Sequence, residues 1–124
     1  MEKWIYLILG GAAGTASRFL LAGFVAHRAG TAFPWGTLSV NLAGCFIIGF
    51  LDVIFERKFL VVHNYRILLM SGFCAAFTTL SSVMLETSDL LKEGQSGYAL
   101  GNIILTMILG FMVFKCGAAL AELL

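Results

Sequence analysis

A run of small and hydroxyl-bearing residues between Gly72 and Glu86 interrupts an otherwise apolar stretch of the chain. The polar members of this run are Thr78, Thr79, Ser81, Ser82 and Glu86. An unpaired polar group in hydrocarbon costs several kcal/mol, so these side chains must face protein, water or an ion. If the run is helical, Thr78, Ser82 and Glu86 share one face, because they recur every fourth position. The pattern therefore predicts a working polar surface inside a membrane helix.

Arg18 places a guanidinium group inside another apolar stretch. Burying such a charge costs at least about 2.5 kcal/mol on insertion scales, so the side chain is expected to turn inward. Two interpretations remain open. Arg18 is either a fixed positive charge at the mouth of an anion path, or it reaches the nearer interface or caps helix carbonyls.

Two asparagines also lie within apolar stretches. Asn41 falls at about one third of the depth of its helix, where its NH2 group either donates to an anion or bridges to another helix. Asn102 begins a stripe with Thr106 and Gly110, spaced by four residues. This stripe either lines the same path as Ser82 or serves only for packing.

The elements that must position these groups follow from composition. The chain has 124 residues, of which 60% are hydrophobic and 12% charged, and its mean hydropathy is +0.94. A small soluble domain cannot bury that much apolar surface, so we expect an all-α integral membrane protein. With about 20 apolar residues per span, residues 1–124 hold one transmembrane domain of four spans, roughly 4–25, 35–55, 66–91 and 97–120, joined by short connectors such as Phe59 to Tyr65. The formal net charge of +1 argues against a nucleic-acid partner.

Local signals refine two of these spans. Gly10 and Gly14 form a GxxxG pair in the first span, which favours close packing against another helix. Gly72 and the hydroxyl cluster indicate that the third span is locally broken, and such backbone survives at membrane depth only where protein or water covers it. In the alternative interpretation, the hydroxyl groups bond back to carbonyls of their own helix.

The remaining reactive residues point to neither a metal cluster nor an enzyme. Cys45, Cys74 and Cys116 lie in separate spans without the paired spacing of a metal site, so we interpret them as small core residues. His63 has no companion at ligand spacing and is expected to be a plain surface histidine. No nucleophile, base and orienting residue can be assembled, so we do not expect an enzyme.

Across all four spans the sequence resembles the bacterial fluoride channel family, called Fluc or CrcB. The matching segments are Gly10-Gly11 with Gly14-Thr-Ala-Ser-Arg18, Gly36-Thr37-Leu38-Ser39-Val40-Asn41 with Gly44, and Gly72-Phe73-Cys74 through Thr78-Thr79 and Ser81 to Glu86. The resemblance implies an antiparallel, dual-topology dimer with two pores along its interface. It also implies passive fluoride export across the bacterial plasma (inner) membrane and a structural sodium ion at the dimer centre.

The resemblance also implies roles for individual residues. Asn41 would be the pore amide, and Thr37, Thr79, Ser81 and Ser82 would lie along the fluoride path as hydroxyl groups. Glu86 would stand toward one end of this polar track, Asn102 would face it from the fourth span, and Arg18 would lie near a vestibule. Backbone carbonyls nearest to Ala75 and Thr78 would hold the sodium ion. These donors suit fluoride, a small and strongly hydrated anion whose water a pore must replace.

The sequence departs from the family at the centre of the third span. Leu80 and Val83 stand where the family pattern has two pore phenylalanines, and neither offers a ring edge to an anion. Ala75 and Ala76 replace a glycine pair, which restricts backbone freedom at the break.

Counting basic residues on each side of the membrane favours one orientation. The N-terminal side carries Lys3, Arg57, Lys58, Arg66 and Lys115, and the opposite side carries Arg28 and Lys92. Five against two favours an N-terminus-in orientation. With the lost phenylalanines, this bias suggests pairing with an oppositely oriented homologous subunit as an alternative to pairing with itself.

Two other functions are weighed against a conducting fluoride channel subunit. In the first, the chain is a non-conducting or half-active partner in a heterodimeric channel, and Leu80 and Val83 mark a dead pore. In the second, it is a small dual-topology multidrug exporter, a class that carries a membrane-embedded glutamate in the first span. The first span here has Arg18 and no acid within its apolar part.

Overall fold

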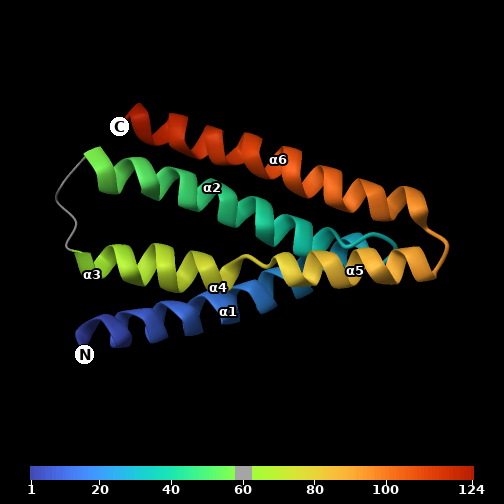
Figure 1. Ribbon diagram of the computed structural model, residues 1–124, viewed down its shortest axis with the longest axis horizontal. Coiled ribbons are helices and arrows are strands. Elements are labelled where there is room, and N and C mark those ends of the chain that lie inside the picture. The colour runs from blue at the N-terminus through green and yellow to red at the C-terminus, as the bar shows by residue number, and fades with distance from the viewer. Residues whose placement is uncertain (58–62) are drawn as a thin grey trace.

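The computed structural model describes residues 1–57 and 63–124. All regular elements of these residues are helical, in the order α1 (Glu2–Ala29), α2 (Trp35–Arg57), α3 (His63–Arg66), η1 (Ile67–Cys74), α4 (Ala75–Phe77), α5 (Leu80–Lys92) and α6 (Ser96–Glu122). The segments α3, η1, α4 and α5 follow one another along a single path across the bundle (Figure 1).

The structure confirms the prediction of four membrane-spanning helices. The helices long and apolar enough to cross a membrane are Glu2–Ala29, Trp35–Arg57, His63–Lys92 and Ser96–Glu122. Each helix contains the whole span expected from hydropathy and is one to four residues longer at one or both ends. Part of the predicted connector Phe59 to Tyr65, and Lys58 of the basic-residue count, lie outside the described residues.

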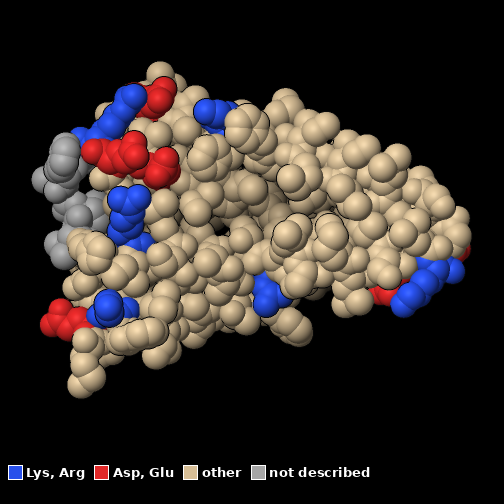
Figure 2. Space-filling view, in the orientation of Figure 1, with Lys and Arg blue, Asp and Glu red and all other residues tan. Residues whose placement is uncertain are grey.

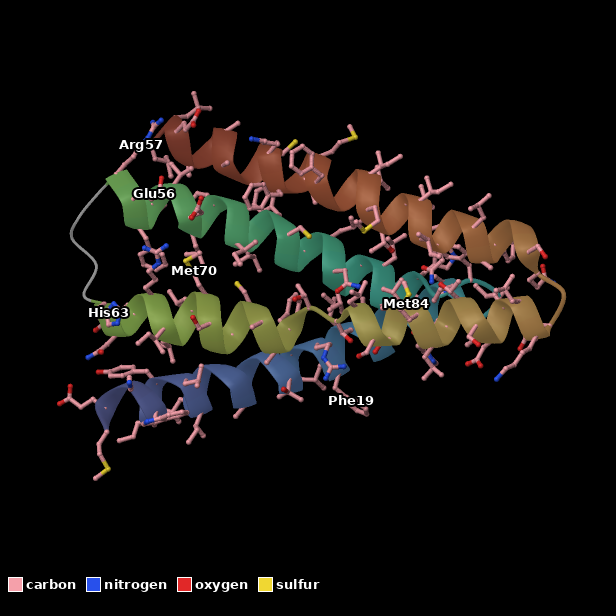
Figure 3. The ribbon with its side chains drawn as sticks, in the orientation of Figure 1. Phe19, Glu56, Arg57, His63, Met70 and Met84 are labelled. Atoms are coloured by element: carbon pink, nitrogen blue, oxygen red, sulfur yellow. The ribbon has the colours of Figure 1, made fainter. Side chains whose placement is uncertain are left out.

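Both termini lie at the same end of the bundle, as an even number of crossings requires (Figure 1). Figure 2 shows that most charged side chains on the visible face gather at this end, with a smaller group at the opposite end. His63 is exposed and lies at this end with Arg57, in agreement with the surface histidine predicted (Figure 3). The central band between the two ends is almost free of charge on this face, as expected for a protein surrounded by lipid (Figure 2).

Two helix pairs dominate the packing, α1 with η1 and α4, and α2 with α6. The predicted GxxxG pair is part of the first contact: a Cβ at Gly10 would lie 2.1 Å from the carbonyl oxygen of Leu68, and one at Gly14 would lie 2.3 Å from that of Phe73. Gly49 of α2 and Gly117 of α6 let these two helices approach equally closely. A Cβ at either glycine would lie 2.2 Å from a backbone oxygen of the other helix. Small residues therefore let these backbones approach directly, which confirms the packing interpretation of Gly10 and Gly14.

The third span is broken, as predicted, between α4 and α5. Thr78 and Thr79 are extended there, with φ/ψ of −86/155° and −153/115°. The eight residues before α4 form the π-helix η1, which the sequence did not predict. The break separates two packing environments, because η1 and α4 lie on α1 whereas α5 lies on α6. It also removes Thr78 from the helical stripe that Ser82 and Glu86 share.

Candidate functional site

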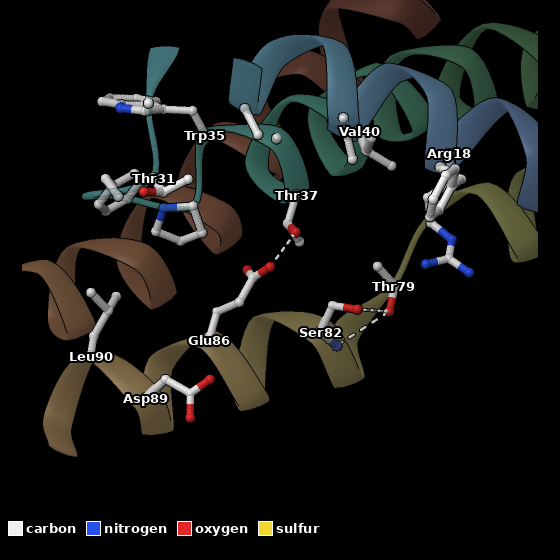
Figure 4. Close-up of a pocket in the computed structure, with 18 of the residues that line it drawn as sticks. Arg18, Thr31, Trp35, Thr37, Val40, Thr79, Ser82, Glu86, Asp89 and Leu90 are labelled. Carbon is white, nitrogen blue, oxygen red and sulfur yellow. Dashed lines mark hydrogen bonds between the residues drawn. The ribbon is translucent and has the colours of Figure 1, made fainter. Parts of the chain in front are cut away.

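A cavity of about 510 Å³, lined by both apolar and polar side chains, lies between α1, α2 and α5, on the side of the break where α5 begins (Figure 4). Predicted site residues that line it are Arg18, Thr37, Thr79, Ser82 and Glu86. They come from three helices that are far apart in sequence. The structure thus brings together most of the polar groups that the sequence singled out.

Thr37 and Glu86 meet across this cavity. The Thr37 hydroxyl donates to Glu86 Oε1 over 2.5 Å, which ties α2 to α5 (Figure 4). The other carboxyl oxygen, Glu86 Oε2, is buried and has no hydrogen-bond partner among the described residues. The carboxyl group therefore retains an unused acceptor beside the cavity.

Thr79 organises the hydroxyl groups at the inner end of the cavity. Its Oγ1 accepts from the backbone N–H of Ser82 at 3.3 Å, so Thr79 is the N-cap of α5. The same hydroxyl donates to Ser82 Oγ at 3.1 Å and lies 3.2 Å from Ser81 Oγ. Ser82 faces the cavity, whereas Ser81 is exposed on the outer surface of this chain.

Asn41 is buried, with 6% of its surface exposed, and bonds to the broken backbone. Its Oδ1 accepts from the N–H of Thr79 at 2.8 Å, and its Nδ2 donates to the carbonyl oxygen of the same residue at 3.1 Å. Of the two sequence interpretations, the structure shows the helix-bridging contact. One N–H of Nδ2 is left over for another acceptor, so the role of pore amide stays a prediction.

Arg18 reaches the break from α1. Its Nε donates to the carbonyl oxygen of Ala76 at 3.1 Å, and the residue also lines the cavity. Figure 4 shows the guanidinium group turned toward Thr79. Arg18 is therefore turned inward, as its cost in lipid predicts, and it combines a capped helix carbonyl with a positive charge in the cavity.

These contacts divert the hydrogen bonds of a continuous helix. In an α-helix the N–H groups of Thr79 and Ser82 would donate to the carbonyls of Ala75 and Thr78. Here they donate to Asn41 Oδ1 and Thr79 Oγ1 instead. The Ala75 and Thr78 carbonyls, which the resemblance relates to sodium, thereby lose their helical donors. The Thr78 hydroxyl bonds back to the carbonyl oxygen of Cys74 at 3.0 Å, as one interpretation of the hydroxyl cluster predicted.

A second hollow of about 390 Å³ forms a mainly apolar groove on the other side of the break. Asn41, Thr78, Leu80, Val83 and Thr106 contribute to its lining. The two positions that differ from the family pattern have opposite environments, because Leu80 is 64% exposed and Val83 only 1%. Leu80 is therefore available to whatever covers this groove, and Val83 is part of the chain's own core.

Asn102 does not join the cavity that contains Glu86. It is completely buried, and its Nδ2 donates to Thr87 Oγ1 at 3.1 Å and to the Val83 carbonyl oxygen at 3.4 Å. The Thr87 hydroxyl in turn donates to the same carbonyl at 2.7 Å. These bonds fasten α5 to α6. The predicted place of Asn102 along the fluoride path is left untested by this arrangement.

The cavity also contains groups that the sequence interpretation did not assign to it. Asp89 of α5 and Glu93, which follows the last residue of α5, also line it, and Figure 4 shows Asp89 beside Glu86 on α5. The sequence contained a signal for both residues, because side chains three and seven positions after Glu86 fall on the same face of a helix. Phe33 lines the cavity from the loop before α2, with its ring centre 4.7 Å from that of Trp35 and 5.7 Å from that of Tyr98.

In the described part of the chain, no group of three or more His, Cys, Asp or Glu residues could hold a metal ion. The carbonyls of Ala75 and Thr78 offer backbone oxygens, and hard cations prefer oxygen ligands.

Comparison with known sequences adds an independent finding. The model of the family "CrcB-like protein, Camphor Resistance (CrcB)" matches residues 5–118, which cover the second and third spans and most of the first and fourth. Among similar proteins, one from Desulforapulum autotrophicum is 40% identical over 123 residues, covering 99% of this chain and 98% of the relative. One from Opitutus terrae is 44% identical over 111 residues, covering 88% and 84%. Both are named "Fluoride-specific ion channel FluC".

Proposed function

Because the chain belongs to the CrcB-like family, we propose that it is a fluoride-specific ion channel subunit that lets fluoride leave the cell passively. The similar proteins named for this activity match the chain over nearly its whole length. In this proposal the chain spans the bacterial plasma membrane with its N-terminus inside, and it transports an ion rather than catalysing a reaction.

The observation that carries the proposal is the cavity that joins Arg18, Thr79 and Ser82 at the broken third span. Fluoride accepts strong hydrogen bonds and enters a pore only where donors replace its water. The guanidinium supplies charged N–H groups, and the hydroxyl groups supply O–H donors along α5. Asn41 lines the groove past the break, and its Nδ2 donates only to the Thr79 carbonyl among the described residues, so a second N–H is available to continue this set of donors.

The groove on the other side of the break supports assembly with a second subunit. It is largely apolar yet contains Asn41, Thr78 and Thr106, and the exposed Leu80 stands beside it. In hydrocarbon such polar groups need a protein or water neighbour. We propose that an antiparallel subunit covers this groove, either a second copy or an oppositely oriented homologue.

The freed carbonyls support a structural sodium ion between the subunits. The Ala75 and Thr78 carbonyls have lost their helical donors to Asn41 and Thr79. Such carbonyl dipoles fit a small cation, as they do in potassium-selective filters. The ion would offset their negative ends at a depth where water is scarce.

A fluoride efflux assay tests the proposed function. The purified chain is placed in liposomes loaded with fluoride, first alone and then together with a homologous partner. We expect fluoride-selective efflux from at least one of these preparations, with chloride-loaded liposomes as the control. Absence of fluoride efflux from both would overturn the channel function.

Leu80 and Val83 favour a second candidate, a half-active or non-conducting member of a heterodimer. The exposed Leu80 offers no ring edge to an anion in the groove, and Val83 is enclosed by its own chain. In that case the chain alone gives little efflux, whereas co-reconstitution with a partner that carries both phenylalanines gives selective efflux.

A further inference from the structure

Asn41 makes two hydrogen bonds to one residue, Thr79, and this pairing selects a backbone conformation. An extended residue presents its N–H and C=O on the same side, as in a residue pair of an antiparallel sheet. A helical residue points these groups in opposite directions along the axis. A carboxamide, with an acceptor and a donor side by side, therefore bonds to both groups only when the residue is extended. Thr79 has this extended conformation, with φ −153° and ψ 115°.

The surface of α2 beside Asn41 also contacts the residues at the break. Gly44 lies one turn further along α2, and a Cβ there would come within 2.2 Å of Thr78 Cγ2 and 3.2 Å of the Phe77 ring. The absence of that Cβ lets Thr78 lie against the helix. Asn41 and Gly44 thus form one receiving face, in which the amide bonds to Thr79 and the glycine accommodates Thr78.

This face controls which carbonyls are available. Without Asn41 Oδ1, the Thr79 N–H has the Ala75 carbonyl as its nearest helical acceptor. We propose that Asn41 is a positioning residue: it holds Thr79 extended and so keeps the Ala75 and Thr78 carbonyls open to a cation. This role rests on the cation site of the proposed function, and it is separate from any contact between Asn41 and fluoride.

The experiment measures how much sodium stabilises the purified oligomer in detergent. Thermal unfolding is compared in sodium chloride and in N-methylglucamine chloride at equal ionic strength. We expect sodium to raise the unfolding midpoint of the unchanged protein. Asn41→Leu, which keeps the branched shape and the number of heavy atoms but removes both bonds, should abolish this rise, and the smaller Asn41→Ala should do the same.

Asn102→Leu is the matched control, because it removes a buried amide from α6 that bonds to Val83 and Thr87 and not to the break. It should lower the midpoint in both salts while preserving the rise with sodium. A full sodium-dependent rise in either Asn41 variant would overturn the proposal, and so would the absence of a rise in the unchanged protein.

Hydrogen exchange in the unchanged protein gives a second measurement that needs no variant. The Thr79 amide should exchange at least about fivefold more slowly than an unbonded amide, as expected for one hydrogen bond worth about 1 kcal/mol or more. Exchange at the unbonded rate would overturn the contact. Fluoride efflux is recorded on the same preparation, and its absence contradicts the channel. The sodium results with the Asn41 variants decide the role of Asn41, because a Thr79 N–H bonded to the Ala75 carbonyl would also exchange slowly.

Discussion

Thr37 of α2 and Glu86 of α5 share a hydrogen bond of 2.5 Å across the cavity, although 49 positions separate them in the sequence. The contact links α2, whose Asn41 bonds to the broken backbone, to α5, which begins directly after the break. Since Glu86 Oε2 has no partner among the described residues, this one bond carries most of the hydrogen bonding of the carboxyl group.

Thr37→Val should destabilise the protein, because the new side chain has the same shape but no donor. A buried acceptor left without its donor costs about 1–3 kcal/mol. We expect a lower thermal unfolding midpoint, whereas Thr37→Ser, which keeps the hydroxyl, should stay close to the original. Thr31→Val is the control, at a cavity residue whose side chain makes no hydrogen bond to residues 1–57 or 63–124. Equal midpoints for Thr37→Val and the original protein would contradict this account.

Gly14→Ala should disturb the contact between α1 and η1, because the added Cβ would lie 2.3 Å from the Phe73 carbonyl oxygen. Overpacking of this kind costs about 1–3 kcal/mol. Gly11→Ala and Gly23→Ala are matched controls in the same helix, since no atom lies within 4 Å of the Cβ at either site. Unfolding measurements should show a loss only for Gly14→Ala, and a comparable loss in the controls would refute the packing argument.

Leu80→Phe should increase fluoride efflux if the missing ring limits conduction, since Leu80 is 64% exposed and a larger side chain fits there. Leu85→Phe provides a control with the same exposure on the same helix. Val83→Phe should instead destabilise the protein by about 1–3 kcal/mol, because the valine is 1% exposed and has no room to grow. Unchanged efflux in Leu80→Phe would count against a pore limited at this position.

Arg18→Gln should reduce fluoride efflux by roughly tenfold or more, because it removes a charged donor worth about 1.5–3 kcal/mol from the cavity. Arg18→Lys retains the charge without the Nε–H that bonds to Ala76, so intermediate efflux is expected. Arg28→Gln is the control, at a surface arginine whose guanidinium lies 5.0 Å from the Phe24 ring centre. Wild-type efflux in Arg18→Gln would show that this charge does not serve the path.

The sequence was sufficient to predict the four spans and the place of the break. Hydrophobic length determines the spans directly. The run of hydroxyl and small residues indicated where backbone groups would seek partners outside the helix, and Thr78 and Thr79 are extended there. These signals are local, so they can be read without knowing how the helices pack.

The partners of the polar groups could not be predicted in the same way. Asn41 and Thr79 are 38 positions apart, and Arg18 and Ala76 are 58 apart, so each pairing depends on how the helices pack. The π-helix η1 was missed for a similar reason, because it forms where the glycines of α1 bring two backbones together. Asn102 was assigned to the path by resemblance, and its bond to Thr87 depends on how α6 meets α5.

The order of the contacts along the chain has a consequence for biosynthesis. Asn41 and Gly44 are translated before Thr78 and Thr79, so their receiving surface already exists when the interrupted segment enters the bilayer. Peptide groups without hydrogen-bond partners are costly in lipid. Because α2 is already in the membrane, the peptide groups of Thr78 and Thr79 spend less time without partners. A rearranged gene that encodes the second helix last should therefore yield less inserted protein than one that keeps the natural order.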